Sequence, residues 1–179
     1  MITNYFIRKR ILKSLESPRP ANLIDFTEAK NIAVVSFISK EFRYEDAGEN
    51  LKRFTDWSEN QFYFYTTPKL QMPVKFIGGN LHTITRKDFT FFGFPKRHLI
   101  ELLRSQEFDL LINIDVSNHI FSHFLSAEIP AKFKVGLSVD AYTNVYDLTL
   151  RLTGNSSTND FFNHLNFYLK ALKGKSHEK

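Results

Sequence analysis

The sequence of 179 residues contains no cysteine. Disulfide bonds, thiolate metal sites and cysteine nucleophiles are therefore excluded. No apolar run approaches the roughly 18 residues that a membrane-spanning helix needs. The chain starts with MITNYFIRKRILKSLE, which carries charges in its middle and lacks the continuous apolar stretch of a secretory signal. From these absences we predict no transmembrane segment and a cytoplasmic location.

Glycine is scarce, with 7 residues, and none occurs in Ser39-Lys40-Glu41-Phe42, which follows the first apolar run. The fingerprint of dinucleotide-binding proteins is therefore missing from its usual place. Gly78-Gly79 lacks the longer glycine array of a phosphate-binding loop and is typical of a turn. The Gly-x-Ser-x-Gly elbow of serine hydrolases is also absent. We predict no catalytic residue and no cofactor; enzymatic activity stays open, but the missing motifs favour a protein that is not an enzyme.

Apolar and helix-like segments alternate along the chain, and 42% of the residues are hydrophobic. Residues 32–38 and 109–115 form nearly continuous apolar runs, which are typical of strands covered on both faces. Residues 67–94 contain several prolines and glycines and are expected to be irregular. We predict further strands at residues 61–66, 132–137 and 146–152, and helices at residues 3–15, 44–57, 95–104, 118–127 and from 158 to Gly174. Ser117 or Asn118 is the expected cap of the helix at 118–127.

This alternation predicts a single three-layer α/β domain with a mostly parallel sheet, Rossmann-like or flavodoxin-like, preceded by a short basic helix. Two prolines in Ser17-Pro18-Arg19-Pro20 mark the one candidate boundary. We therefore expect a basic helix with a proline linker at residues 1–20, the α/β domain at 21–174 and a polar tail at 175–179.

The net charge of +5 is concentrated in residues 1–20, 67–104 and 160–179, with acidic stretches between them. If these segments meet on one face, they form a patch that attracts anions; if they point apart, they are ordinary solvated surface. The basic helix could dock on its own domain, lie on an anionic membrane or contact RNA phosphates. The candidate anion-binding residues are Arg8, Lys9, Arg10, Lys13, Arg86, Lys87, Lys96 and Arg97.

Four phenylalanines, Phe89, Phe91, Phe92 and Phe94, lie among these bases. Nucleic-acid-binding proteins combine aromatic rings for stacking with bases for phosphate contacts. The chain has 19 phenylalanines, however, so a buried or half-buried strand is the simpler interpretation of this segment.

Asp115, His119 and His123 stand four residues apart, a spacing at which two histidines and a carboxylate can bind a divalent metal. They are weak metal candidates, because Asp115 precedes the predicted helix and no glutamate neighbours the histidines, and we predict no metal site. Ligands of open α/β sheets bind beyond the carboxyl ends of the strands. A candidate ligand pocket at this edge comprises Ser39, Asp115, His119 and Ser138.

The segments Glu107–Ile114, Phe121–Ala127, Lys132–Leu137 and Tyr146-Asp147-Leu148 carry two resemblances. Nearly the whole chain resembles an uncharacterised family of small proteins from Bacteroidota, which implies a fold and no established activity. Residues 31–137 more loosely resemble the N-terminal half of heptosyltransferase-type glycosyltransferases, but without the glycine–aspartate turn after the first strand. This second resemblance implies an acceptor-side half without its donor half, which is not expected to catalyse the reaction alone.

Three functions stay open. The favoured one is a non-enzymatic protein whose basic segments bind an anionic partner, with RNA or a ribonucleoprotein foremost, and whose affinity falls steeply with salt. The second is a small-molecule-binding or enzymatic α/β domain that uses the pocket beyond the strands. The third is a protein–protein adaptor, with a homo-oligomer as one form, that uses the aromatic segment 89–94.

Overall fold

The computed structural model describes residues 2–16, 29–38, 61–66, 80–139, 141–152 and 158–176. Within these ranges one sheet has the strand order β3-β2-β1-β4-β5-β6, and every pairing in it is parallel. This is the order of the Rossmann fold, so the predicted α/β class is confirmed, and the flavodoxin-like order is not the one adopted. The strands are β1 (Ile32–Ile38), β2 (Gln61–Thr66), β3 (Asn80–Ile84), β4 (Phe108–Asn113), β5 (Ala131–Leu137) and β6 (Leu148–Leu150).

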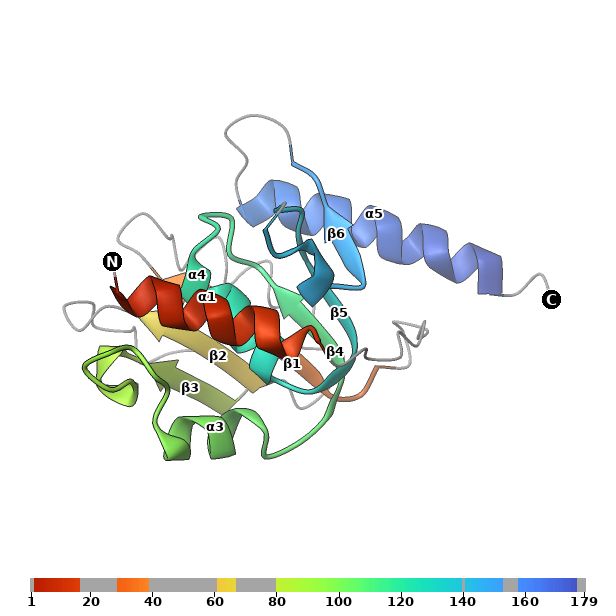
Figure 1. Ribbon diagram of the computed structural model, residues 1–179. Helices are drawn as coiled ribbons and strands as arrows, with labels where there is room; N and C mark the ends of the chain where they lie inside the picture. The colour runs from red at the N-terminus through yellow and green to blue at the C-terminus, as the bar shows by residue number, and fades with distance from the viewer. Residues whose placement is uncertain are drawn as a thin grey trace.

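Helices cover both faces of the sheet, which gives three layers (Figure 1). The first face carries α1 (Ile2–Ser14), α3 (Arg97–Leu103) and α4 (Ile120–Glu128), and the second carries α5 (Thr158–Ser176). Within the described ranges, no helix is long and apolar enough to cross a bilayer.

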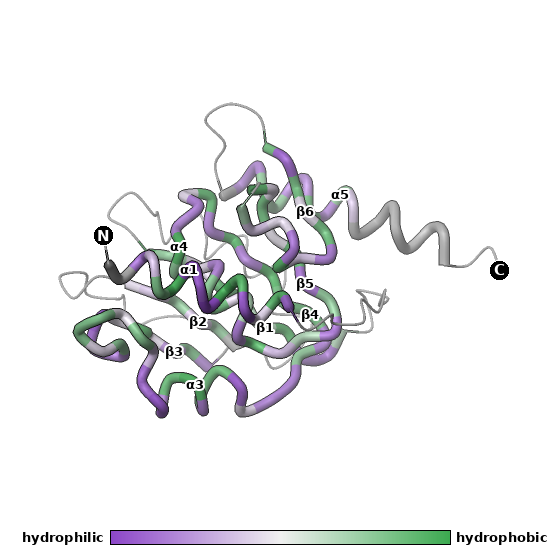
Figure 2. The backbone as a smooth tube through the Cα atoms, in the orientation of Figure 1, coloured by the Kyte–Doolittle hydropathy of each residue, from purple (hydrophilic) through white to green (hydrophobic). Residues whose placement is uncertain are grey.

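Each central strand contributes to two cores, because successive side chains of a strand point to opposite faces. Val34 and Ile112 pack toward α5, whereas Val35 and Leu111 pack toward α1, α3 and α4. The apolar runs of β1 and β4, visible as green tube in Figure 2, are therefore buried on both sides. The α5 core also contains Phe62, Phe64, Phe133, Phe161, Phe162 and Leu165, and the other core contains Tyr63, Tyr65, Phe108, Phe121 and Phe124.

The basic helix α1 docks on the body of the protein. Its Ile7 and Ile11 are fully buried and belong to the same core as Leu125 of α4. Helix α1 therefore buries an apolar edge against the domain and leaves its basic side chains at the surface. The predicted boundary at Pro18 and Pro20 lies outside the described residues and stays a prediction.

The predicted strand of phenylalanines is wrong. Residues 89–95 form a loop in which Phe89 and Pro95 make an isolated antiparallel bridge, and Gly93 has a φ of 90°. A positive φ suits glycine, and it turns the chain back so tightly that no strand can continue. Phe89 is buried, but Phe91 is 89% exposed, Phe92 58% and Phe94 46%.

Several other boundaries differ from the prediction. Strand β3 lies in the segment expected to be irregular, where it adds to the sheet beside β2. Helix α3 begins at Arg97, and α4 is capped by His119 instead of Ser117 or Asn118. Helix α5 continues through Gly174 to Ser176. The predicted helix at 44–57 and the Gly78-Gly79 turn lie outside the described residues.

Candidate functional site

The carboxyl ends of β1 and β4 are neighbours in the sheet, with Val35 opposite Asn113. From β1 the chain adds β2 and β3 toward one edge of the sheet, and from β4 it adds β5 and β6 toward the other edge. The direction in which strands are added therefore reverses between β1 and β4. Open α/β sheets bind their ligands at such a reversal. Asp115 and His119 follow β4 at this edge, and Ser138 follows β5. Ser39 lies outside the described residues.

Asp115 is buried, and both of its carboxylate oxygens accept hydrogen bonds from the turn before α4. Oδ1 accepts from the backbone N–H and the hydroxyl of Ser117, at 2.9 and 2.5 Å. Oδ2 accepts from the backbone N–H of His119 at 2.8 Å and from the hydroxyl of Ser122 at 2.6 Å. The carboxylate is therefore occupied in closing the turn that starts the helix.

His119 caps α4 through its ring. Its Nδ1 accepts the backbone N–H of Phe121 at 3.3 Å, and its ring lies on Phe37 of β1 with centroids 3.8 Å apart and an interplanar angle of 8°. Burial lowers the pKa of His119, and the nearby Asp115 carboxylate opposes this shift. These contacts fix the imidazole between β1 and α4.

His123 is the centre of a buried hydrogen-bond chain. Its Nε2 lies 2.5 Å from Asn118 Oδ1, which only accepts, so Nε2 carries the hydrogen. Burial lowers the pKa of His123 to about 4, so the ring is neutral at pH 7 and its Nδ1 accepts from the Tyr146 hydroxyl at 2.7 Å. The Tyr146 oxygen in turn accepts from Asn113 Nδ2 at 2.6 Å.

This chain of bonds joins the end of β4, the body of α4 and the segment before β6, and no buried side-chain polar atom of the described residues lacks a hydrogen-bond partner. Within the part of the chain that the structure describes, no group of three or more histidines and carboxylates could hold a metal ion. Sequence reasoning singled out Asp115, His119 and His123 but missed their partners. Ser117 and Asn118 were expected only as helix caps, and Asn113, a polar residue at the end of an apolar run, is a further partner with a signal in the sequence.

The eight candidate anion-binding residues divide into two groups. Three of them are already engaged within the protein. Arg10 pairs with Glu128, Arg97 pairs with Glu101, and Arg86 donates to the backbone oxygens of Thr90 and Phe91 at 2.5 and 2.6 Å. The side chains of the other five make no hydrogen bond or ion pair within the described residues, and all are exposed: Arg8, Lys9, Lys13, Lys87 and Lys96.

Helix α1 meets the loop that follows β3. The rings of Phe6 and Phe94 lie 4.5 Å apart, and Tyr5 meets Phe6 edge to face at 5.4 Å. At 100° per residue, Lys9 and Lys13 lie within about 60° of Phe6 around the helix, whereas Arg8 lies on the far side.

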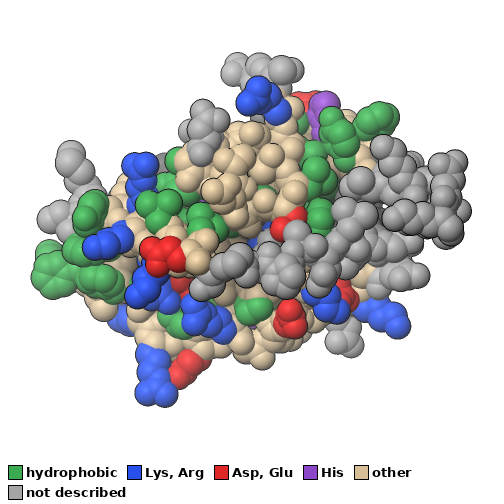
Figure 3. Space-filling model, turned by 45° about the vertical axis from the view of Figure 1, so that its right-hand side comes forward, with side chains coloured by type: hydrophobic (Ala, Val, Ile, Leu, Met, Phe, Trp, Pro, Cys, Tyr) green, Lys and Arg blue, Asp and Glu red, His purple; other side chains and the backbone are tan. Residues whose placement is uncertain are grey.

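Two of the three basic segments are therefore brought together, and the third, on α5, lies at the other end of the molecule (Figure 1). Figure 3 shows hydrophobic side chains gathered at one end of the visible face, with Lys and Arg side chains beside them. We define the aromatic–basic surface as the aromatic residues and unpaired lysines of α1 and of the loop after β3: Tyr5, Phe6, Lys9, Lys13, Lys87, Phe91, Phe92, Phe94 and Lys96.

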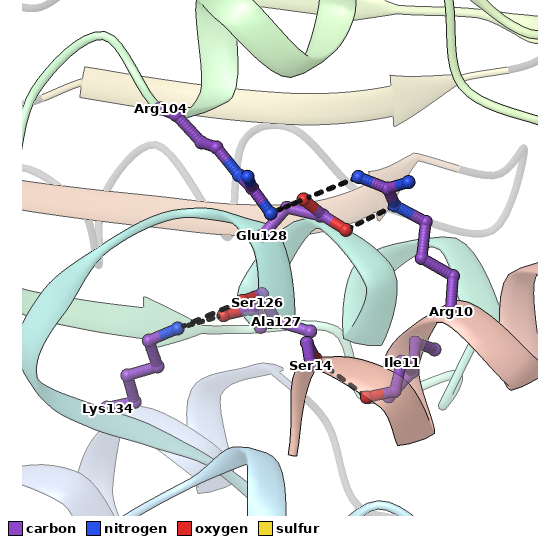
Figure 4. A network of polar contacts seen from close by, with 8 residues as sticks. All are labelled: Arg10, Ile11, Ser14, Arg104, Ser126, Ala127, Glu128 and Lys134. Atoms are coloured by element: carbon purple, nitrogen blue, oxygen red, sulfur yellow. Dashed lines mark hydrogen bonds and ion pairs between the residues drawn. The ribbon is translucent and has the colours of Figure 1, made fainter. Parts of the chain in front are cut away.

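A buried carboxylate connects α4 to α1 and to the turn after α3 (Figure 4). Glu128, at the end of α4, receives Arg10 from α1 and Arg104 from the turn after α3, the latter at 2.8 Å. Beside it, Lys134 Nζ of β5 donates to the carbonyl of Ser126 at 2.5 Å, where the last carbonyls of a helix attract cations. Glu128 is the one carboxylate of α4 and stands at its last position, a signal that sequence reasoning did not use.

Comparison with known proteins gives one family and one structural likeness. The sequence model of a family described as "Family of unknown function (DUF6913)" matches residues 4–172. No curated protein matches the sequence. Among solved structures, E. coli heptosyltransferase WaaC with ADP is similar with a TM-score of 0.49 and 14% identity. The match covers 75% of this chain and 45% of that enzyme, and it concerns the arrangement of helices and strands alone.

Proposed function

The chain belongs to the DUF6913 family, whose function is unknown, and we propose that it is a non-enzymatic binding protein that engages RNA through the aromatic–basic surface. The contact between Phe6 and Phe94 carries this proposal, because it brings two separate basic segments to one place. The organism group suggested by the sequence resemblance stays a prediction.

The four lysines of the surface suit a polyanion. Lys9 and Lys13 lie on α1, and Lys87 and Lys96 belong to the loop after β3. No ion pair within the described ranges neutralises them. Unpaired lysines of this kind bind successive phosphates and release counterions, which supplies most of the affinity for a nucleic acid. Exposed phenylalanines between them add surface that can stack on bases.

The polar groups at the edge of β1 and β4 support binding in preference to catalysis. Asp115 and His123 bond neighbouring protein groups through both of their side-chain polar atoms, and His119 uses its Nδ1 to cap α4. A general base or nucleophile needs a reactive atom that a substrate can reach. The described residues of this edge supply a rigid support for α4.

The test is the salt dependence of RNA binding, measured by fluorescence anisotropy with a labelled single-stranded RNA. Each lysine that contacts a phosphate contributes about 0.7 to the slope of log affinity against log salt, so four lysines give a slope of about −3. Lys9→Gln combined with Lys96→Gln should lower the affinity and reduce the slope by about 1.4.

The matched control removes two charges at other edges of the sheet. Lys30 precedes β1 at the amino end, and Arg151 follows β6 at the edge opposite β3. The double variant Lys30→Gln/Arg151→Gln should keep the wild-type slope. Absence of binding by the wild type at 50 mM salt, or an equal loss in both double variants, would contradict the proposal.

A further inference from the structure

Phe91 and Phe92 are the most exposed phenylalanines of the loop after β3. Their rings meet edge to face with centroids 5.5 Å apart, so each ring keeps a face open to solvent. Large apolar side chains exposed together on a soluble protein mark a surface that binds something. The two rings lie at the tip of a loop that lysines flank on both sides, at Lys87 and Lys96.

The loop holds these rings in place before any partner binds. Arg86 clamps the backbone oxygens of Thr90 and Phe91. Across the loop, Thr90 N–H donates to the Phe94 oxygen at 2.7 Å, and the Phe94 N–H donates to the Thr90 hydroxyl at 3.1 Å. A surface that is already ordered loses little conformational entropy when it binds.

Resting on the function proposed above, we propose that Phe91 and Phe92 stack on unpaired bases, so that the RNA bound at this surface is single-stranded. A duplex hides the faces of its bases and shows mainly phosphates, 2′-hydroxyls and groove edges. A single strand exposes a flat face on every base, and a phenyl ring binds that face without regard to sequence. The lysines beside the loop then contact the phosphates on either side of the stacked bases.

Insertion of the same rings into a lipid bilayer is the competing interpretation, and Arg86 argues against it. Its guanidinium bonds the carbonyl oxygens of Thr90 and Phe91, and within the described ranges no carboxylate pairs with it. Insertion of the tip would draw this charge out of water at a cost of several kcal/mol. Near an RNA backbone the same charge stays hydrated and attracts phosphate.

Three probes separate stacking from phosphate contact: a labelled 12-nucleotide oligouridylate, the same ribose–phosphate chain without bases, and a 12-base-pair RNA duplex. The wild type should bind the oligouridylate at least tenfold more tightly than the chain without bases. Phe91→Ala and Phe92→Ala should each lower affinity for the oligouridylate about tenfold and leave affinity for the chain without bases unchanged. The slope against salt should stay at its wild-type value in both variants, since no phosphate contact is lost.

Phe167→Ala is the matched control, because Phe167 is also largely exposed but lies on α5, at the other end of the molecule. It should bind all three probes as the wild type does. Circular dichroism of each variant checks that the fold is kept, as expected for exposed positions.

The outcomes separate the two proposals. Salt-dependent binding that is unchanged in Phe91→Ala/Phe92→Ala, or equal affinity for the oligouridylate and the duplex, overturns stacking and leaves RNA binding standing. Failure of the wild type to bind any of the three probes overturns both. Phe91-dependent binding to phosphatidylcholine vesicles with 30% phosphatidylserine, without RNA binding, assigns the surface to a membrane and also overturns both.

Discussion

Arg10 of α1 and Glu128 of α4 form an ion pair between residues 118 positions apart in the sequence. The Glu128 side chain is 2% exposed and the Arg10 side chain 36%, so the carboxylate is buried and the guanidinium reaches the surface. Arg10 therefore contributes to the fold, whereas its neighbour Lys9 remains available to a partner. One basic segment thus combines a structural role with a proposed binding role.

Glu128→Gln should lower the free energy of unfolding by about 3 kcal/mol, because it leaves the guanidinium groups of Arg10 and Arg104 facing each other without their shared carboxylate. Urea unfolding followed by circular dichroism measures the loss. Glu101→Gln removes an exposed partner of Arg97 and should change stability by no more than about 0.5 kcal/mol. Equal stabilities for the two variants would show that the buried pair does not hold α1.

Gly136→Ala should destabilise the protein because Tyr146 occupies the space that a side chain needs. A Cβ at Gly136 would lie 2.5 Å from the Tyr146 ring, well inside van der Waals contact. The ring cannot move away easily, since its hydroxyl is bonded to Asn113 and His123. We expect a loss of about 2 kcal/mol in urea unfolding.

The same substitution at Gly174 serves as the control. Gly174 lies within α5, and alanine is the better helix former by about 1 kcal/mol. Gly174→Ala should therefore leave stability unchanged or raise it. If Gly136→Ala unfolded at the same urea concentration as the wild type, the Tyr146 ring would be able to shift. The hydrogen-bond chain through His123 would then be less rigid than the structure indicates.

Stability should fall as the pH is lowered from 6.5 toward 4 because of His123. Its pKa is lowered to about 4 in the folded protein, from an ordinary value of 6.5. In this range the unfolded chain binds a proton at His123 that the folded protein does not bind, so acid favours unfolding. Between pH 7 and 5 the loss amounts to about 2 kcal/mol from this residue.

His123→Gln removes the titrating group, so the variant should lose about 2 kcal/mol less than the wild type between pH 7 and pH 5. The lowered pKa of His119 acts in the same direction and remains in the variant, which should therefore keep a smaller dependence on pH. His164→Gln, at an exposed position on α5, should behave as the wild type does. If the free energy of unfolding changed with pH equally in the wild type and in His123→Gln, His123 would not be the source of the acid sensitivity.

The fold could be predicted because burial on both faces leaves a direct mark on the sequence. The strands β1 and β4 are apolar at nearly every position, and only a sheet covered on both sides needs such runs. Strand order leaves no such mark, and β3 was missed because its sequence, NLHTI, belongs to a half-exposed edge. The sequence therefore predicted the layers, and the register between strands came from the structure.

The candidate sites could be predicted only in part, because their partners are distant in the sequence. Asp115 and His119 were placed at the edge of the sheet by the rule for parallel strands. Nothing near them indicates that Tyr146, which is 23 residues from His123, completes the chain of hydrogen bonds. The exposure of Phe91 and Phe92 could not be predicted, because a segment rich in phenylalanine normally indicates a buried strand. The turn that exposes these rings depends on the backbone angle of Gly93, which the sequence does not show.

The clamp by Arg86 gives a prediction about the loop itself. Its guanidinium donates from Nη1 to the Thr90 oxygen and from Nη2 to the Phe91 oxygen, a two-pronged contact that a lysine cannot reproduce with its single nitrogen. Arg86→Lys should therefore loosen residues 90–94 while the charge stays the same. Local opening exposes the loop to proteases, so chymotrypsin should cleave after Phe91 or Phe92 several times faster than in the wild type.

Mass spectrometry of the fragments identifies the cleaved bond. The control is Lys87→Arg, which exchanges the same two residue types at the next position. The control should be cut at the wild-type rate, because Lys87 contributes no side-chain hydrogen bond to the loop among the described contacts. If the loop is ordered by Arg86, Arg86→Lys should also weaken binding of oligouridylate, since rings that must first be ordered bind less tightly. Faster cleavage without weaker binding would mean that the rings do not need the clamp to meet their partner.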